Sequence, residues 1–149
     1  MKDRMYYGFI AGIIAGIAQS AITFFLNFVK FADKRLFDFT SEILYGRLPL
    51  NAYDSILAYI VAIGFSGVLG IGYAYLIPLV SSDHYRFKGV IYSVFVWFAI
   101  YTVTALFKLP DLYYTTPYTA TTNLIAAIVY GLVLAEVTKR LISSRPAKY

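Results

Sequence analysis

The chain of 149 residues contains no cysteine, which excludes disulfides, thiolate metal sites and cysteine nucleophiles. Histidine occurs once, as His84, in a short loop beside Asp83. A metal site needs further ligands, and a haem-binding bundle needs histidines within its helices, so we expect a surface histidine. The sequence has no glycine-rich phosphate loop, because its glycines keep helical spacing within apolar runs. We therefore expect no catalytic, cofactor-binding or metal-binding residues, and a protein that is not an enzyme.

Charge is also scarce, since charged residues make up 14% of the chain, against about 25% in ordinary soluble domains. Hydrophobic residues make up 60%, too many for the single core of a soluble protein of this length. The composition predicts one integral membrane domain over residues 1–149, with the lipid bilayer as its surroundings. The net charge of +5 does not indicate a nucleic-acid partner, because the basic residues lie beside apolar runs, where membrane orientation and lipid headgroups explain them.

Four apolar runs are long enough to cross a bilayer, which takes about 20 residues. We expect an all-α bundle of four transmembrane helices at about residues 5–29, 55–80, 89–107 and 119–142. The first run follows a basic N-terminus, as in a signal peptide, but it is too long and lacks a small-residue cleavage site, so we expect it to be retained. The short loop after the second run predicts that the second and third spans form an antiparallel hairpin.

A short amphipathic helix is predicted between the first two spans, at about residues 33–46. On a helical wheel its apolar and polar residues fall on opposite sides, and Gly46 and Pro49 end it. Such a helix lies in the membrane interface as a connector, or folds over the mouth of the bundle as a lid on a polar cavity. The sequence leaves both interpretations open.

Small residues follow one face of the apolar runs, while isoleucine and phenylalanine follow the opposite face. This pattern is typical of helices that approach one another closely in a membrane and turn their bulky side to lipid. The predicted packing residues are Gly8, Gly12, Gly16, Ser66, Gly70, Gly131 and Ala135. Two small residues stand four positions apart near the start of the first run, Gly8 and Gly12, and of the third run, Gly89 and Ser93. The first two runs and the last two runs could therefore be a parallel repeat.

Five polar residues within the runs form a candidate intramembrane site: Gln19, Thr23, Asn27, Asn123 and Glu136. The amides either join helices through hydrogen bonds or line a polar cavity that opens outward. Glu136 precedes Lys139 and Arg140 at the spacing of helical ion pairs, and the alternative is a proton or ion role. Trp97 falls near the middle of the third run, where its indole N–H needs an acceptor inside the bundle or on a bound ligand.

The basic residues predict the orientation. Eight lie at the end of the bundle that carries both termini and five at the opposite end. The positive-inside rule then predicts a multi-pass protein of the cell membrane with both termini in the cytoplasm.

Three stretches, GFIAGIIAG, FKGVIYSVFVW and IVYGLVLAEV, carry a resemblance to a known group. The chain resembles small four-span membrane proteins of uncharacterised function that are common in Gram-positive bacteria. The resemblance implies a four-helix membrane fold and nothing more, and it transfers no catalytic or ligand-binding position.

Three functions remain open from the sequence. The first is a non-enzymatic assembly or accessory subunit, packed through its small-residue faces as a homo-oligomer or within a larger membrane complex. The second is a small oligomeric transporter or channel, with Gln19, Asn27, Asn123 and Glu136 along a polar pathway. The third is a lipid-binding protein, which the amphipathic segment and the basic loops would serve.

Overall fold

The computed structural model describes residues 3–79, 83–109 and 114–143. These residues form five α-helices and one short 3-10 turn, with no β-strand among them. In chain order the elements are α1 (Arg4–Phe28), α2 (Leu36–Tyr45), α3 (Ala52–Leu76), η1 (Ile77–Leu79), α4 (Tyr85–Leu106) and α5 (Pro117–Ser143). Helices α1, α3, α4 and α5 are long and apolar enough to cross a membrane. The predicted all-α fold with four membrane-spanning helices is confirmed.

The helix ends follow capping chemistry. Asn51 precedes α3, and its side chain accepts a hydrogen bond of 2.8 Å from the backbone N–H of Asp54, so α3 starts before the apolar run that predicted it. Gly46 adopts the left-handed conformation, with φ of 67°, and ends α2 as predicted. Pro117 is the first residue of α5, a position where its missing N–H costs no helical hydrogen bond. The predicted end of the second span, Val80, lies outside the described residues.

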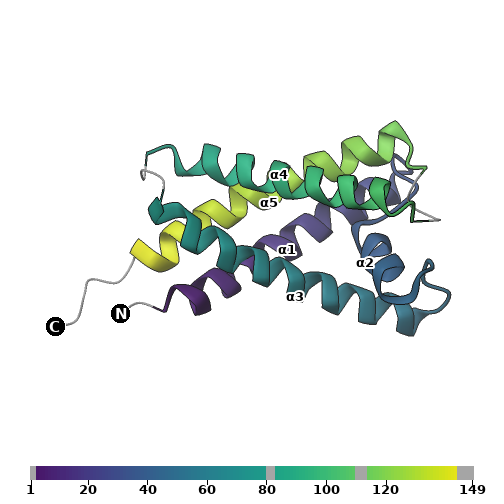
Figure 1. Ribbon diagram of the computed structural model, residues 1–149, viewed down its shortest axis with the longest axis horizontal. Coiled ribbons are helices and arrows are strands. Elements are labelled where there is room, and N and C mark those ends of the chain that lie inside the picture. Colours follow the sequence, from purple (N-terminus) through teal and green to yellow (C-terminus); the bar gives the residue numbers. More distant parts are fainter. Residues whose placement is uncertain (1–2, 80–82, 110–113, 144–149) are drawn as a thin grey trace.

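The four long helices run antiparallel to their neighbours (Figure 1). Helix α1 packs against both α3 and α5, α4 packs against α5, and α2 packs against α3. The start of α1 and the end of α5 lie at one end of the bundle, and α2 lies at the other end (Figure 1). Large apolar side chains cover the outside, for example Ile17, Phe25 and Phe95, each more than half exposed. In a bilayer this outer surface meets lipid.

Close backbone contact joins the helices in two pairs. In the α1–α3 pair, a side chain on Gly70 would collide with the backbone of Gly8 and Gly12. In the α4–α5 pair, a side chain on Gly131 would collide with the backbone of Gly89. The structure places every predicted packing residue at one of these two interfaces: Gly8, Gly12, Gly16, Ser66 and Gly70 at the first, and Gly131 and Ala135 at the second.

Helices α3 and α4 follow one another as the expected antiparallel hairpin, but over the described residues they do not pack closely. Tyrosine side chains bridge them instead. The Tyr73 hydroxyl donates a hydrogen bond of 2.9 Å to the backbone oxygen of Tyr85, and the Tyr92 hydroxyl donates one of 2.8 Å to the backbone oxygen of Leu69. Because a tyrosine needs far more room than a glycine, these bridges keep the two helices apart.

Helix α2 falls within the segment where an amphipathic helix is predicted, but its faces differ from the expectation. Ser41 and Glu42 on its polar side are buried, whereas Ile43 and Leu44 on its apolar side are exposed. Phe37 and Phe39 of the apolar side are buried as well, so burial does not separate the two predicted faces. The buried Ser41 hydroxyl has a partner, because it donates to the backbone oxygen of Arg47 at 3.2 Å. The interfacial position of α2 stays a prediction.

Candidate ligand-binding cavity

A cavity of about 160 Å³ lies where α3 and α4 stay apart. Helices α1 and α5 form its floor and α2 closes one end, so all five α-helices contribute to its wall. The residues that line it are Gln19, Phe39, Thr40, Ile43, Ala62, Phe65, Ser66, Leu69, Ser93, Val96, Trp97, Ile100, Tyr101, Asn123, Ala127 and Tyr130. Most of this wall is apolar and aromatic, and none of these residues carries a charge.

The floor of the cavity is fixed by a buried hydrogen bond between α5 and α3. Tyr130 is 3% exposed, and its hydroxyl donates to the backbone oxygen of Ser66 at 2.7 Å. The Ser66 hydroxyl in turn donates to the backbone oxygen of Ala62, one helical turn earlier, at 3.0 Å. Both polar groups are therefore satisfied within the protein, and they hold the floor in place rather than leaving free groups for a ligand.

Asn123 and Trp97 each carry a buried polar atom without a partner. Asn123 is 1% exposed, and its amide nitrogen donates to the hydroxyl of Tyr101 at 3.1 Å. Among the described residues, neither the amide oxygen of Asn123 nor the indole nitrogen of Trp97 has a hydrogen-bond partner. The ring centroids of Trp97 and Tyr101 are 4.9 Å apart. A free acceptor and a free donor therefore belong to neighbouring residues of the same cavity wall, and each costs about 1–3 kcal/mol while unpaired.

The cavity opens sideways to the outer surface of the bundle. Two of the residues that line it also reach that surface: Phe65 on α3 is 52% exposed and Ile43 on α2 is 69% exposed. Since α3 is long and apolar enough to span a membrane, the surface beside Phe65 meets lipid rather than water once the chain is in a bilayer. A molecule dissolved in the lipid can approach this opening directly.

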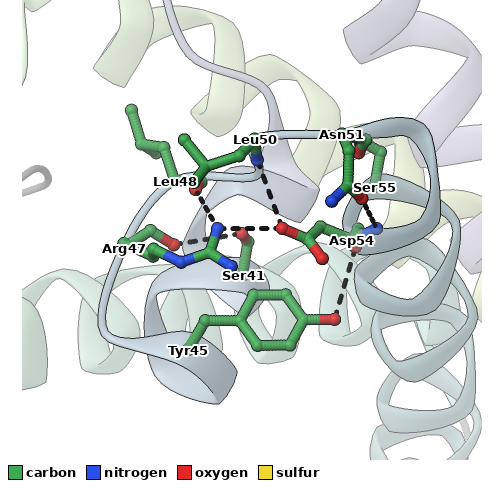
Figure 2. A network of polar contacts seen from close by, with 8 residues as sticks. All are labelled: Ser41, Tyr45, Arg47, Leu48, Leu50, Asn51, Asp54 and Ser55. Carbon is green, nitrogen blue, oxygen red and sulfur yellow. Dashed lines mark hydrogen bonds and ion pairs between the residues drawn. The ribbon is translucent and has the colours of Figure 1, made fainter.

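Helix α2 is held at its end of the cavity by a network of polar contacts around Asp54 (Figure 2). One carboxylate oxygen of Asp54 pairs with the Arg47 guanidinium at 2.8 Å and accepts the backbone N–H of Leu50 at 3.3 Å. The hydroxyl of Tyr45 on α2 reaches the backbone oxygen of Asp54 at 3.4 Å. Arg47 also accepts the Ser41 hydroxyl at its backbone oxygen. The network ties α2 to the first turn of α3, and so fixes the part of the cavity wall that α2 supplies.

The structure brings two of the five predicted polar residues together, because Gln19 and Asn123 both line the cavity. The side chains of Thr23 and Asn27 form hydrogen bonds to backbone oxygens instead. The Thr23 hydroxyl donates to the backbone oxygen of Gln19 in its own helix at 3.0 Å, and the Asn27 amide donates to the backbone oxygen of Ala32 at 2.8 Å, which holds the turn after α1.

Glu136 lies near the first turn of α4, six residues after Tyr130 in α5, and does not line the cavity. Its carboxylate pairs with Arg140 at 3.0 Å and with Arg86 of α4 at 3.0 Å, and it accepts the hydroxyl of Tyr85 at 2.9 Å. Lys139, an expected partner, lies over the ring of Tyr85 at 4.1 Å from its centroid. Glu136 therefore joins α4 to α5 at the end of the bundle opposite α2.

The sequence singles out Trp97 but not its neighbours Tyr101 and Tyr130. Tyrosine is common in this chain, with 15 copies, so no motif separates these two from the rest. Arg86 was not identifiable as a partner of Glu136 either, because that pairing depends on how α4 packs against α5. Among the described residues, no group of three or more His, Asp and Glu side chains is placed to hold a metal ion.

The four long apolar helices define a small, helical, multi-pass membrane protein. The chain belongs to the family of unknown function DUF6789, whose match covers residues 2–148. No curated protein and no solved structure matches the chain.

Proposed function

We propose that this protein is a non-enzymatic binding protein for a small lipid-soluble molecule, which enters the cavity between α3 and α4 from the bilayer. The observation that carries the proposal is the cavity of about 160 Å³, whose opening is bordered by the exposed side chains of Phe65 and Ile43. An apolar cavity of about 150 Å³ is large enough to bind benzene. The lining contains serine and threonine hydroxyls but no acid, histidine or lysine to activate them, which supports binding over catalysis.

The small-residue faces favour this function over an assembly or accessory role. Their number suggested a partner protein, yet Gly12 and Gly70 contact each other between α1 and α3, and Gly89 and Gly131 do so between α4 and α5. These faces are thus occupied within one chain. A transporter is less well supported, because a polar pathway would have to include Glu136, which is held in ion pairs with Arg86 and Arg140.

The predicted orientation gives the cavity a place in the membrane. With both termini in the cytoplasm, α2 lies on the outer side of the cell membrane. The cavity then opens into the half of the bilayer nearer to α2, where Phe39 and Ile43 of α2 help to line it.

The proposal is tested by filling the cavity. Ala62 lines it, whereas the neighbouring Val61 is 37% exposed and does not line it. The variants Ala62→Phe and Val61→Phe therefore add side chains of the same kind inside and outside the cavity. Each protein is purified in mild detergent from its native membrane, and organic extracts are compared by mass spectrometry.

We expect the wild type and Val61→Phe to retain the same small molecule and Ala62→Phe to lose it. Matching elution profiles and unfolding temperatures of the two variants show that both are folded. Retention of no molecule by the wild type, or equal retention by both variants, would overturn the proposal.

A further inference from the structure

We infer that the molecule bound in this cavity is uncharged and that its buried end is a ring carrying a hydroxyl group, with an apolar tail that reaches into the lipid. The inference rests on the proposed binding function and names the chemistry of the ligand from three features of the wall: its charge, its unpaired hydrogen-bonding atoms, and its size and composition.

The wall excludes a charged ligand. None of the described residues that line the cavity is ionised, and its polar members are amides, hydroxyls and an indole. Moving a phosphate, carboxylate or ammonium group from water or headgroups into such surroundings without an opposite charge is strongly unfavourable. The ion pairs of the bundle, Arg47 with Asp54 and Arg86 with Glu136, already have their partners elsewhere. Anionic and zwitterionic lipid headgroups are therefore not the buried group.

One ligand group that pairs with both of the unpaired atoms has to donate and to accept. The indole N–H of Trp97 can only donate, and the amide oxygen of Asn123 can only accept. A hydroxyl group accepts from the first and donates to the second. A ketone, a quinone or an ether has no proton to donate and would leave the oxygen of Asn123 buried and unpaired, at a cost in affinity.

The size and the walls of the cavity favour a single ring. A volume of about 160 Å³ is close to that of a cavity of about 150 Å³ that binds benzene. Aromatic side chains form much of the wall: Phe39, Phe65, Trp97, Tyr101 and Tyr130. Aromatic walls favour a flat partner, which stacks or packs edge to face with them. The remainder of the ligand lies at the opening beside Phe65 and Ile43, where an apolar tail continues into lipid.

The test uses matched probes and the single tryptophan of the chain. Delipidated protein in nanodiscs is titrated with 4-octylphenol, with its methyl ether 4-octylanisole and with 1-octanol. Emission of Trp97 is excited at the red edge of its absorption, where phenols and tyrosines absorb little. We expect 4-octylphenol to change this emission saturably and to bind about tenfold more tightly than the methyl ether, which cannot donate to Asn123. We expect 1-octanol, which lacks the ring, to bind more weakly than 4-octylphenol.

Two variants locate the effect. Asn123→Leu removes the acceptor and should bring 4-octylphenol and 4-octylanisole to nearly equal affinity. Thr121→Leu is the matched control on the exposed side of α5, and it should keep the tenfold preference. If Asn123→Leu does not fold, the comparison of the three probes on the wild type still decides the question.

The outcomes separate this inference from the proposed function. Equal binding of the phenol and its ether overturns the hydroxyl, and equal binding of 1-octanol overturns the ring, while saturable binding of either kind keeps the binding function. A charged molecule recovered in the extraction experiment overturns the ligand class alone. Failure of all three probes, together with no retained molecule in that experiment, overturns both.

Discussion

Most hydroxyl groups within the membrane-spanning helices form a hydrogen bond to the backbone of their own helix. The hydroxyls of Thr23, Ser66 and Thr104 each donate to the backbone oxygen four residues earlier in the same helix. This local bond needs no partner helix, so such residues carry little information about where a site lies. The amide of Asn123 has more groups to satisfy than the one contact with Tyr101 provides. For this reason the amide, rather than the more numerous hydroxyls, marks the cavity.

Asp38 on α2 should make stability depend on pH. Burial raises the pKa of its carboxyl group above the ordinary value of 3.8, although the backbone N–H and the guanidinium of Arg35 oppose this shift. A raised pKa means that the folded protein favours the neutral acid, so the contribution of Asp38 is most favourable at pH values below about 4 and worsens as the pH rises through the folded pKa. An asparagine side chain at this position would remain neutral throughout.

The measurement compares unfolding temperatures of the wild type and Asp38→Asn between about pH 4 and pH 8. The oxygen of asparagine can still accept the backbone N–H of Arg35, which lies 2.6 Å from the carboxylate, so the variant should match the wild type at low pH and exceed it slightly at neutral pH. A wild type that gains on the variant as the pH rises would show that Asp38 is stabilised as an anion.

At the scale of helices, the sequence predicts which surfaces approach closely but not which helix meets which. Glycine spacing identifies Gly12, Gly70 and Gly131 as packing positions, and the capping residue Asn51 marks the start of α3. The distance between α3 and α4 could not be predicted, because the sequence is equally compatible with Tyr73 and Tyr92 as packing, interfacial or lipid-facing residues. The cavity depends on that distance, so its position was not predictable even though Asn123 and Trp97 were both identified as polar groups in need of partners.

The α4–α5 contact should tolerate no side chain at Gly131. In Gly131→Ala the new methyl group meets the backbone of Gly89 and the hydroxyl of Ser93, and backbone cannot shift as a flexible side chain can. We expect a loss of about 1–3 kcal/mol in the free energy of unfolding, measured by denaturation in mixed micelles.

Gly64→Ala on α3 is the matched control for this prediction. Apart from the adjacent backbone of α3 itself, no atom lies within 4 Å of a Cβ at that position, so alanine should be neutral or stabilise the helix by up to about 1 kcal/mol. Equal effects of the two substitutions would mean that helix propensity, and not contact between α4 and α5, sets the result.

The network around Asp54 should control how firmly α2 covers its end of the cavity. Asp54→Asn removes the charge that pairs with Arg47 at 2.8 Å and should raise hydrogen exchange of the α2 amides about tenfold, since a charged hydrogen bond contributes about 1.5–3 kcal/mol. Exchange mass spectrometry should show no change in α4 and α5. The exposed Asp83 provides the control substitution, Asp83→Asn, and similar exchange of α2 in both variants would contradict the role of the network.

For the whole molecule, the position of the cavity follows from how two helix pairs meet. The two contacts between the pairs, which we call seams, differ in the size of their side chains. Each pair is close and antiparallel, α1 with α3 and α4 with α5. Along the seam between α1 and α5, Ala11, Ala15 and Leu134 are fully buried and the helices pack closely. Along the seam between α3 and α4, tyrosines act as spacers. Because one seam is closed with small residues and the other is bridged by large ones, the cavity lies along the seam between α3 and α4.

The orientation of the bundle in the membrane decides which half of the bilayer supplies the ligand. Eight basic residues at the end that carries the termini, against five at the other, predict that this end faces the cytoplasm. Since the chain has no cysteine, a single introduced cysteine reports one site. Leu50, beside α2, and Asp83, before α4, are both exposed. In intact cells a membrane-impermeant maleimide should label Leu50→Cys, and should label Asp83→Cys only after the membrane is opened. The reverse pattern would place α2 and the opening of the cavity toward the cytoplasmic half of the bilayer, and the ligand would then be drawn from that half.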